Sequence, residues 1–129
     1  METLMVDYAG GLKFRTLART HEIISDQPLG KGEDTGPTPP ELFIAAIGSC
    51  IGVYACFFAQ RHDISLAGMK IEMSWEKAEN PGRIGNIRAK MTLPGGVPEQ
   101  YREPLHRAAQ ACLLHNTLLD SPRLELTLE

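Results

Sequence analysis

The chain has 129 residues, of which 43% are hydrophobic and 22% are charged, both near the globular average. This length predicts a single domain spanning residues 1–129, large enough to bury a core without a metal or a disulfide. The formal net charge of −3 at pH 7 argues against nucleic acid as a partner.

Three short strands are predicted at the start of the chain. Apolar and polar residues alternate over 4–8 and again over 12–16, with a turn at Gly10 and Gly11 between them, and 21–25 fits a third strand. Residues 26–38 are rich in glycine and proline. They lack the spacing of a phosphate-binding loop, so we interpret them as a flexible connector.

A long helix follows, and its start is well marked. Thr38 suits the N-cap, Pro39 the first helical position, and Glu41 can complete a capping box with Thr38. Residues 42–59 carry no formal charge, and Gly48 and Gly52 have a spacing found in membrane helix pairs. The alternative is the buried centre of a soluble fold. We favour it because the flanking amphipathic segments need an apolar partner, and so we expect no membrane association.

The second half of the chain predicts a hairpin, a helix and a last strand. Residues 69–76 and 87–93 alternate in polarity around a turn at 79–82. The regular part of the second helix is expected over 104–115, starting at Pro104, with or without a leading turn from Pro98, and stopping at Asn116. Residues 124–128 read as a strand. Grouped strands with two helices predict an α+β fold with antiparallel sheets.

The cysteines are the main candidates for chemistry. Cys50 lies in the long helix among small residues, and Cys112 is expected on the core face of the second helix. Cys56 is about 240° around the helix from Cys50, so the two cannot bridge within it. A Cys50–Cys112 disulfide is possible where the helices cross. The alternative is a small buried hydrophobe, which we retain for Cys56. An odd number of cysteines and acidic first residues predict a cytoplasmic protein without a signal peptide.

The histidines do not form a metal-binding pattern. Cys112 and His115 are one loose pair, whereas structural zinc usually needs four ligands, so we expect no metal. His115 is interpreted as a polar residue at a helix end, and His21, His62 and His106 as surface residues.

Two segments resemble a known family. Residues 36–50 (GPTPPELFIAAIGSC) resemble the central-helix motif of the OsmC/Ohr family, the osmotically inducible and organic hydroperoxide resistance proteins. Residues 111–118 (ACLLHNTL) resemble its second cysteine motif, and the order of elements fits as well. The resemblance implies an OsmC-like fold with antiparallel sheets around a long buried central helix, in an intertwined homodimer. It also implies a thiol peroxidase without a bound cofactor, in which Cys50 attacks a hydroperoxide, Cys112 forms a disulfide with it, and an external dithiol reduces the pair.

Such a reaction needs a cysteine thiolate, and its activating charge must come from elsewhere in the fold. Cys50 lies twelve positions after Thr38, beyond the reach of the helix dipole. The resemblance implies an arginine on the N-terminal strand, so Lys13 and Arg15 are the candidate activating cations. Pro40 stands where the hydroperoxide-specific branch has a glutamate, and the capping box explains Glu41. This chain therefore looks more like the general OsmC-like branch.

Two functions follow as expectations. The first is a peroxidase for small apolar hydroperoxides, with a pocket lined by residues such as Phe43, Ile47 and Phe57. The second is a non-catalytic protein that senses oxidation or binds an acyl or thiol-bearing ligand in an apolar pocket between two subunits. Turnover with a dithiol would favour the first, and a stable co-purified ligand without turnover the second.

Overall fold

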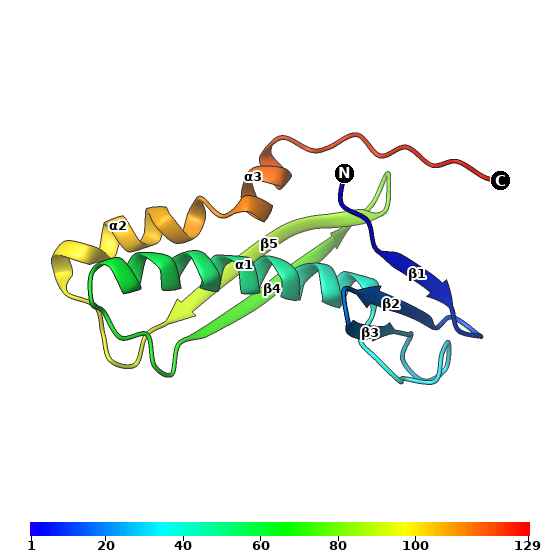
Figure 1. Ribbon diagram of the computed structural model, residues 1–129, viewed down its shortest axis with the longest axis horizontal. Coiled ribbons are helices and arrows are strands. Elements are labelled where there is room, and N and C mark those ends of the chain that lie inside the picture. The colour runs from blue at the N-terminus through cyan, green and yellow to red at the C-terminus, as the bar shows by residue number, and fades with distance from the viewer. The chain divides into compact units, whose positions relative to one another are not determined.

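The computed structural model describes all residues, 1–129, and divides into two compact units, Met1–Ile44 and Ala45–Glu129 (Figure 1). The long helix runs from the first unit into the second. In chain order the elements are β1 (Met5–Tyr8), β2 (Phe14–Ala18), β3 (His21–Ser25), α1 (Pro39–Arg61), β4 (Lys70–Ala78), β5 (Arg83–Thr92), α2 (Glu99–Gln110) and α3 (Leu113–Leu119).

The first unit holds an antiparallel sheet in the order β1-β2-β3. Val6 pairs with Thr16, which in turn pairs with Ile23. Met5 and Val6 are 65% and 56% exposed. Because neighbouring residues of a strand point to opposite faces, both faces of this sheet carry uncovered apolar side chains. The three predicted strands are confirmed to within two residues.

Asp26 organises the connector between β3 and α1. The residue is 1% exposed, and its carboxylate accepts a hydrogen bond from Thr35 Oγ1 at 2.6 Å. The backbone N–H groups of Gln27 and Thr35 donate to the same carboxylate at 2.7 and 3.1 Å. These bonds, with the Thr35 hydroxyl contributing most, lower the pKa of Asp26 to about 2. The connector, predicted to be flexible, is therefore folded around a buried acid.

This carboxylate should make stability depend on acid pH. Its pKa is lower in the folded chain than the ordinary value of 3.8, so it stabilises the fold above that value and the contribution is lost as the pH falls through about 2. We expect Asp26→Asn to lower the thermal unfolding midpoint at pH 7 and the difference from wild type to shrink between about pH 4 and 2. Calorimetry across that range checks this, and a difference that does not vary with pH would contradict it.

Helix α1 begins with the predicted capping box. The N–H of Thr38 donates to Glu41 Oε1 at 2.8 Å, and the N–H of Glu41 donates to Thr38 Oγ1 at 3.3 Å. The Thr38 backbone N–H, followed by the Thr38 hydroxyl, lowers the pKa of Glu41. Glu41 therefore has a structural partner, as the sequence predicted.

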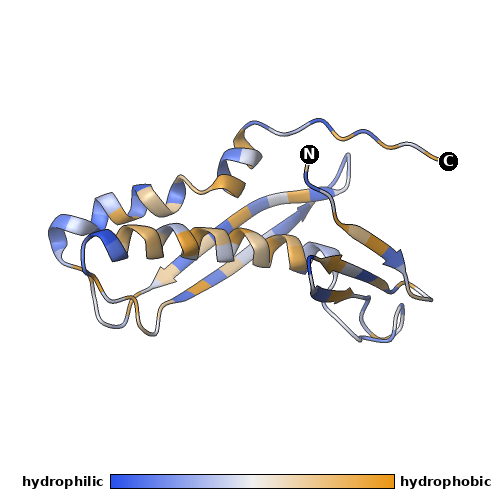
Figure 2. Cartoon of the chain, viewed as in Figure 1, coloured by the Kyte–Doolittle hydropathy of each residue, from blue (hydrophilic) through white to orange (hydrophobic).

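Glycines in α1 allow the β4–β5 hairpin to approach closely. A Cβ added at Gly48 would lie 3.0 Å from Met73 Cγ, and one at Gly52 would lie 3.2 Å from Ile71 Cδ1. Figure 2 shows that α1 is apolar over most of its length, and by length and composition it could cross a membrane. In this structure 39% of the most apolar 18-residue stretch of α1 is buried. The paired glycines thus serve packing between helix and hairpin.

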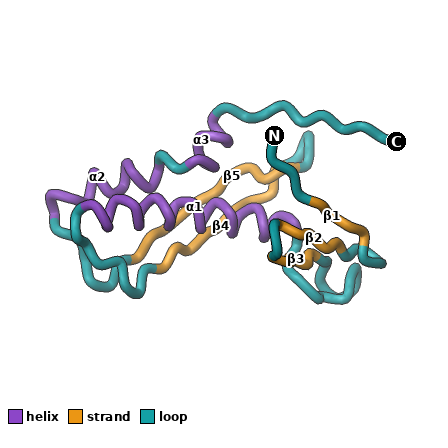
Figure 3. Tube along the Cα trace, in the orientation of Figure 1, coloured by secondary structure: helices purple, strands orange, loops and turns teal.

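The core of the second unit lies between α1 and α2. Ala55 and Phe58 of α1 pack with Leu105 and Ala109 of α2. The leading turn from Pro98 is present, because α2 begins at Glu99. The predicted start of the regular helix at Pro104 and its stop at Asn116 are wrong, because α2 contains Pro104 and α3 extends to Leu119. A loop at Ala111 and Cys112 separates the two helices (Figure 3). Burial of Leu105 and Ala109 offsets the hydrogen bond that Pro104 cannot make.

The predicted last strand is also wrong. Residues 121–129 form no regular structure and extend away from α3 (Figure 1). Leu124, Leu126 and Leu128 are 86%, 89% and 99% exposed. Alternation of apolar and polar residues predicts strand character, but a strand forms only where a neighbour accepts its backbone hydrogen bonds, and here none pairs with this segment.

Candidate functional site

The structure brings Cys50 and Cys112 together. Cys50 lies in α1 and is half-buried, and Cys112 lies in the loop between α2 and α3 and is 0% exposed. The Cys50 side chain lies near enough to Cys112 to raise the pKa of the Cys112 thiol. Both residues belong to the second unit, and both thiols are free. The pair therefore combines a half-buried cysteine with a fully buried one.

The local setting of Cys112 differs from the prediction. It was expected on the core face of a continuous helix, but its backbone is extended, with φ −71° and ψ 154°, and it forms the N-cap of α3. Its sulfur accepts the N–H of His115 at 3.4 Å. The interruption of the helix turns this sulfur to the start of α3, where N–H groups lack helical partners.

Burial dominates the electrostatics of Cys112. It raises the pKa of the Cys112 thiol, the N–H of His115 lowers it in part, and the nearby Cys50 raises it further. Cys112 therefore keeps its proton at neutral pH. A thiol in this state is a poor nucleophile toward peroxide.

The two candidate cations lie in the first unit and already have acidic partners. Lys13 Nζ is 3.4 Å from Glu33 Oε1, and Arg15 Nε is 3.1 Å from Glu22 Oε1. Both pairs are partly exposed, and ion pairs of this kind contribute little to stability. Each cation therefore remains available to exchange its partner. Their assignment as activating groups stays a prediction.

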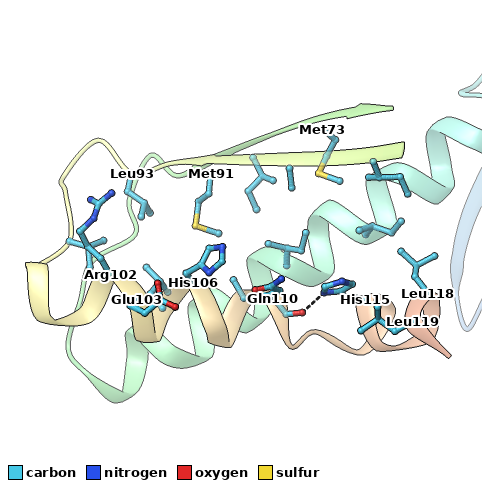
Figure 4. A pocket seen from close by; sticks show the side chains of 18 of the residues that line it. Met73, Met91, Leu93, Arg102, Glu103, His106, Gln110, His115, Leu118 and Leu119 are labelled. Carbon is cyan, nitrogen blue, oxygen red and sulfur yellow. Dashed lines mark hydrogen bonds between the residues drawn. The ribbon is translucent and has the colours of Figure 1, made fainter. Parts of the chain in front are cut away.

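A cavity of about 1010 Å³ opens between the hairpin, α1, α2 and α3 (Figure 4). Its apolar side includes Ile47 of α1 and the inward-facing residues of β4 and β5. Its polar side is a stripe along α2 that ends at His115 in α3. The hairpin and the residue that follows it contribute Ile71, Met73, Ile87, Met91 and Leu93 to the apolar side. The polar side consists of Arg102, Glu103, His106, Gln110 and His115.

The sequence located this cavity only in part. Of the three residues predicted to line it, Ile47 does so, whereas Phe43 and Phe57 are 44% and 50% exposed and do not. The hairpin residues were missed, although their alternation marked an inward face. The polar stripe was missed too, although positions 99, 102, 103, 106 and 110 share one face of a helix.

The histidines take more specific positions than the sequence suggested. His115 lies in the first turn of α3 and lines the cavity, so it is not a residue at the end of a long helix. The ring of His62 stacks on Phe58 and Tyr101 at 4.3 and 4.7 Å between centroids. No group of three or more His, Cys, Asp or Glu side chains that could hold a metal ion is present.

The family model of OsmC-like proteins matches residues 31–127, which include both cysteines of the pair. The chain belongs to the OsmC-like family. Its α+β fold, with antiparallel sheets and a long central helix, is the OsmC-like fold. The predictions of family and fold class are therefore confirmed. No curated protein matches the sequence significantly.

Solved structures from three bacteria share this fold. A Psychrobacter arcticus protein, provisionally assigned to osmotic stress and detoxification, is 22% identical over 91% of this chain and 88% of that chain, with TM-score 0.83. The organic hydroperoxide resistance protein OsmC of Legionella pneumophila is 24% identical over 92% and 90%, with TM-score 0.60. A Vibrio cholerae protein, provisionally an organic hydroperoxide resistance protein, holds captopril in one of its active sites. It is 15% identical over 94% and 87%, with TM-score 0.68.

Proposed function

We propose that this OsmC-like protein is a thiol-dependent peroxidase that reduces organic hydroperoxides. The family includes cysteine-based peroxidases, which use no bound cofactor. The observation that carries the proposal is the proximity of two free thiols of unequal exposure, because Cys50 is half-buried while Cys112 is fully buried near it. The reaction belongs in the cytoplasm, where small dithiol proteins keep such pairs reduced.

The cycle has three balanced steps. The Cys50 thiolate attacks the terminal oxygen of the hydroperoxide, the O–O bond breaks, and the alkoxide leaves and takes a proton to become an alcohol. Cys50 is then a sulfenic acid. The sulfur of Cys112 attacks that of Cys50, an S–S bond forms, and the hydroxyl group leaves with the Cys112 proton as water. An external dithiol reduces this disulfide to two thiols and is itself oxidised.

A positive charge near Cys50 completes the proposal. Lys13 or Arg15 supplies it by exchanging its glutamate partner for the thiolate. Pro40 occupies the position that the resemblance assigns to a glutamate of the hydroperoxide-specific branch. The Cys50 thiolate is therefore stabilised by the cation alone, with no carboxylate at position 40, which fits the general OsmC-like branch.

Steady-state turnover tests the function. Purified chain should consume cumene hydroperoxide repeatedly in the presence of excess dithiothreitol. Cys56→Ser should consume it at the wild-type rate, because Cys56 has no place in the cycle. Failure of the wild-type chain to exceed one equivalent per chain with a panel of dithiols would contradict the peroxidase.

The cavity favours a second candidate function, binding of an apolar ligand with a polar end. Its volume of about 1010 Å³ is at the upper end of small-molecule sites, and it combines an apolar wall with a polar stripe. In this alternative the cysteines respond to oxidation without turnover. A stoichiometric ligand found by native mass spectrometry, together with absent turnover, would favour it.

We also propose that the chain works as an intertwined homodimer. Uncovered apolar residues occur in each unit, including Met5 and Val6 on β1 and Val53 and Phe57 on α1, which are 47% and 50% exposed. Val53 and Phe57 lie four residues apart and share a face of the helix. Association of two chains would cover these surfaces.

Light scattering measures this association. The wild-type chain should have twice the mass of one chain at micromolar concentration. Phe57→Glu should shift it toward monomer, because a carboxylate would be buried without a partner. Gln100→Glu, at an exposed polar position of α2, is the matched control and should leave the dimer intact. A folded wild-type monomer would contradict the homodimer.

A further inference from the structure

His115 connects the two sides of the break between α2 and α3. Its ring Nδ1 is in hydrogen-bond contact with the backbone carbonyl of Gln110, the last residue of α2. This contact is drawn in Figure 4. The backbone N–H of the same residue donates to Cys112 Sγ at 3.4 Å. His115 therefore contacts the residue that ends α2 and the cysteine that begins α3.

The carbonyl of Gln110 determines that Nδ1 of the His115 ring carries a proton. A carbonyl oxygen only accepts, so Nδ1 of His115 carries a proton and donates it. The carbonyl of Gln110 is in the last turn of α2, where an α-helix leaves carbonyls without partners. The imidazole thus caps α2 from within α3, and this bond spans the Ala111–Cys112 loop.

We infer that His115 is the positioning residue of Cys112, an inference that rests on the proposed disulfide cycle. Its ring holds the loop in the conformation that buries the Cys112 sulfur beside Cys50. The S–S bond of the second step can form only when the sulfurs are already close, and a free loop would have to be ordered first. His115 takes no electron and no proton in that step.

Two substitutions separate the Nδ1 contact from the bulk of the ring. In His115→Asn the side-chain amide N–H₂ can occupy about the position of Nδ1 and donate to Gln110, whereas in His115→Gln it lies nearer the position of Nε2. Thr117→Ala is the matched control. It removes the 2.9 Å hydrogen bond from Thr117 Oγ1 to the carbonyl of Leu113, inside α3 but away from the break.

The closing experiment measures how readily the Cys50–Cys112 disulfide forms. All variants carry Cys56→Ser, are equilibrated in glutathione redox buffers, and are alkylated for mass spectrometry. His115→Gln should lower the effective concentration of the two thiols about tenfold, the loss expected for one hydrogen bond. His115→Asn and Thr117→Ala should stay within about twofold of the parent.

Three results would overturn the inference: no disulfide in the parent, equal losses in His115→Asn and His115→Gln, or an equal loss in Thr117→Ala. If the effective concentrations of the variants follow the expected order but the parent shows no peroxidase turnover, the role of His115 is supported and the proposed function is contradicted. Peroxidase turnover in the parent, together with an unchanged effective concentration of the thiols in His115→Gln, would support the proposed function and contradict the role of His115.

Discussion

Replacing Cys50 with serine should lower dithiol-dependent consumption of cumene hydroperoxide by at least about a thousandfold. A serine hydroxyl does not ionise at neutral pH and cannot form a sulfenic acid, so the first step has no nucleophile. Cys112 cannot take over, because it is fully buried and burial raises its pKa.

The matched control for that variant is Cys56→Ser, which removes another half-buried thiol of the same helix. It should retain the wild-type rate. Circular dichroism should show that both variants keep their helical content. Turnover that persists in Cys50→Ser would rule out Cys50 as the peroxide-reactive residue.

Replacing Cys112 with serine should separate the two halves of the cycle. One hydroperoxide should be consumed per chain at nearly the wild-type rate, because Cys50 still reacts. The sulfenic acid then has no thiol partner and should persist long enough to be trapped by a dimedone-type probe on Cys50. Turnover should fall to the rate at which external dithiol reduces the sulfenic acid directly.

Peptide mapping of the trapped product checks the assignment. The probe should be found on the peptide containing Cys50. Labelling of Cys56 instead, or steady-state turnover equal to that of the wild type, would show that Cys112 does not resolve the intermediate.

Local signals predicted the parts of the fold that local interactions determine. The capping box of Thr38 and Glu41 fixed the start of α1, because its hydrogen bonds join residues three apart. Alternation of apolar and polar residues located β4 and β5, because this pattern is also set by residues close together in the chain. The C-terminal leucines alternate equally well, but a strand also needs a neighbour along its edge, and the sequence does not show whether one is present.

The sequence named the two cysteines of the candidate site but not their local geometry. The cysteine motifs identified Cys50 and Cys112, and the structure brings them together. The position of Cys112 was missed because Pro104 was expected to start the helix, whereas packing of Leu105 and Ala109 outweighs that preference. The contact of His115 with Gln110 depends on the break that follows. The cavity arises from segments far apart in the chain, so no single motif could reveal it.

The covalent state of the cysteines after one equivalent of hydroperoxide tests the central claim most directly. Mass spectrometry of the unreduced chain should show a loss of two hydrogens, and its peptide map should join the peptides of Cys50 and Cys112. A stable oxygen adduct on Cys50 beside a free Cys112 thiol, or a disulfide that includes Cys56, would contradict the two-cysteine mechanism.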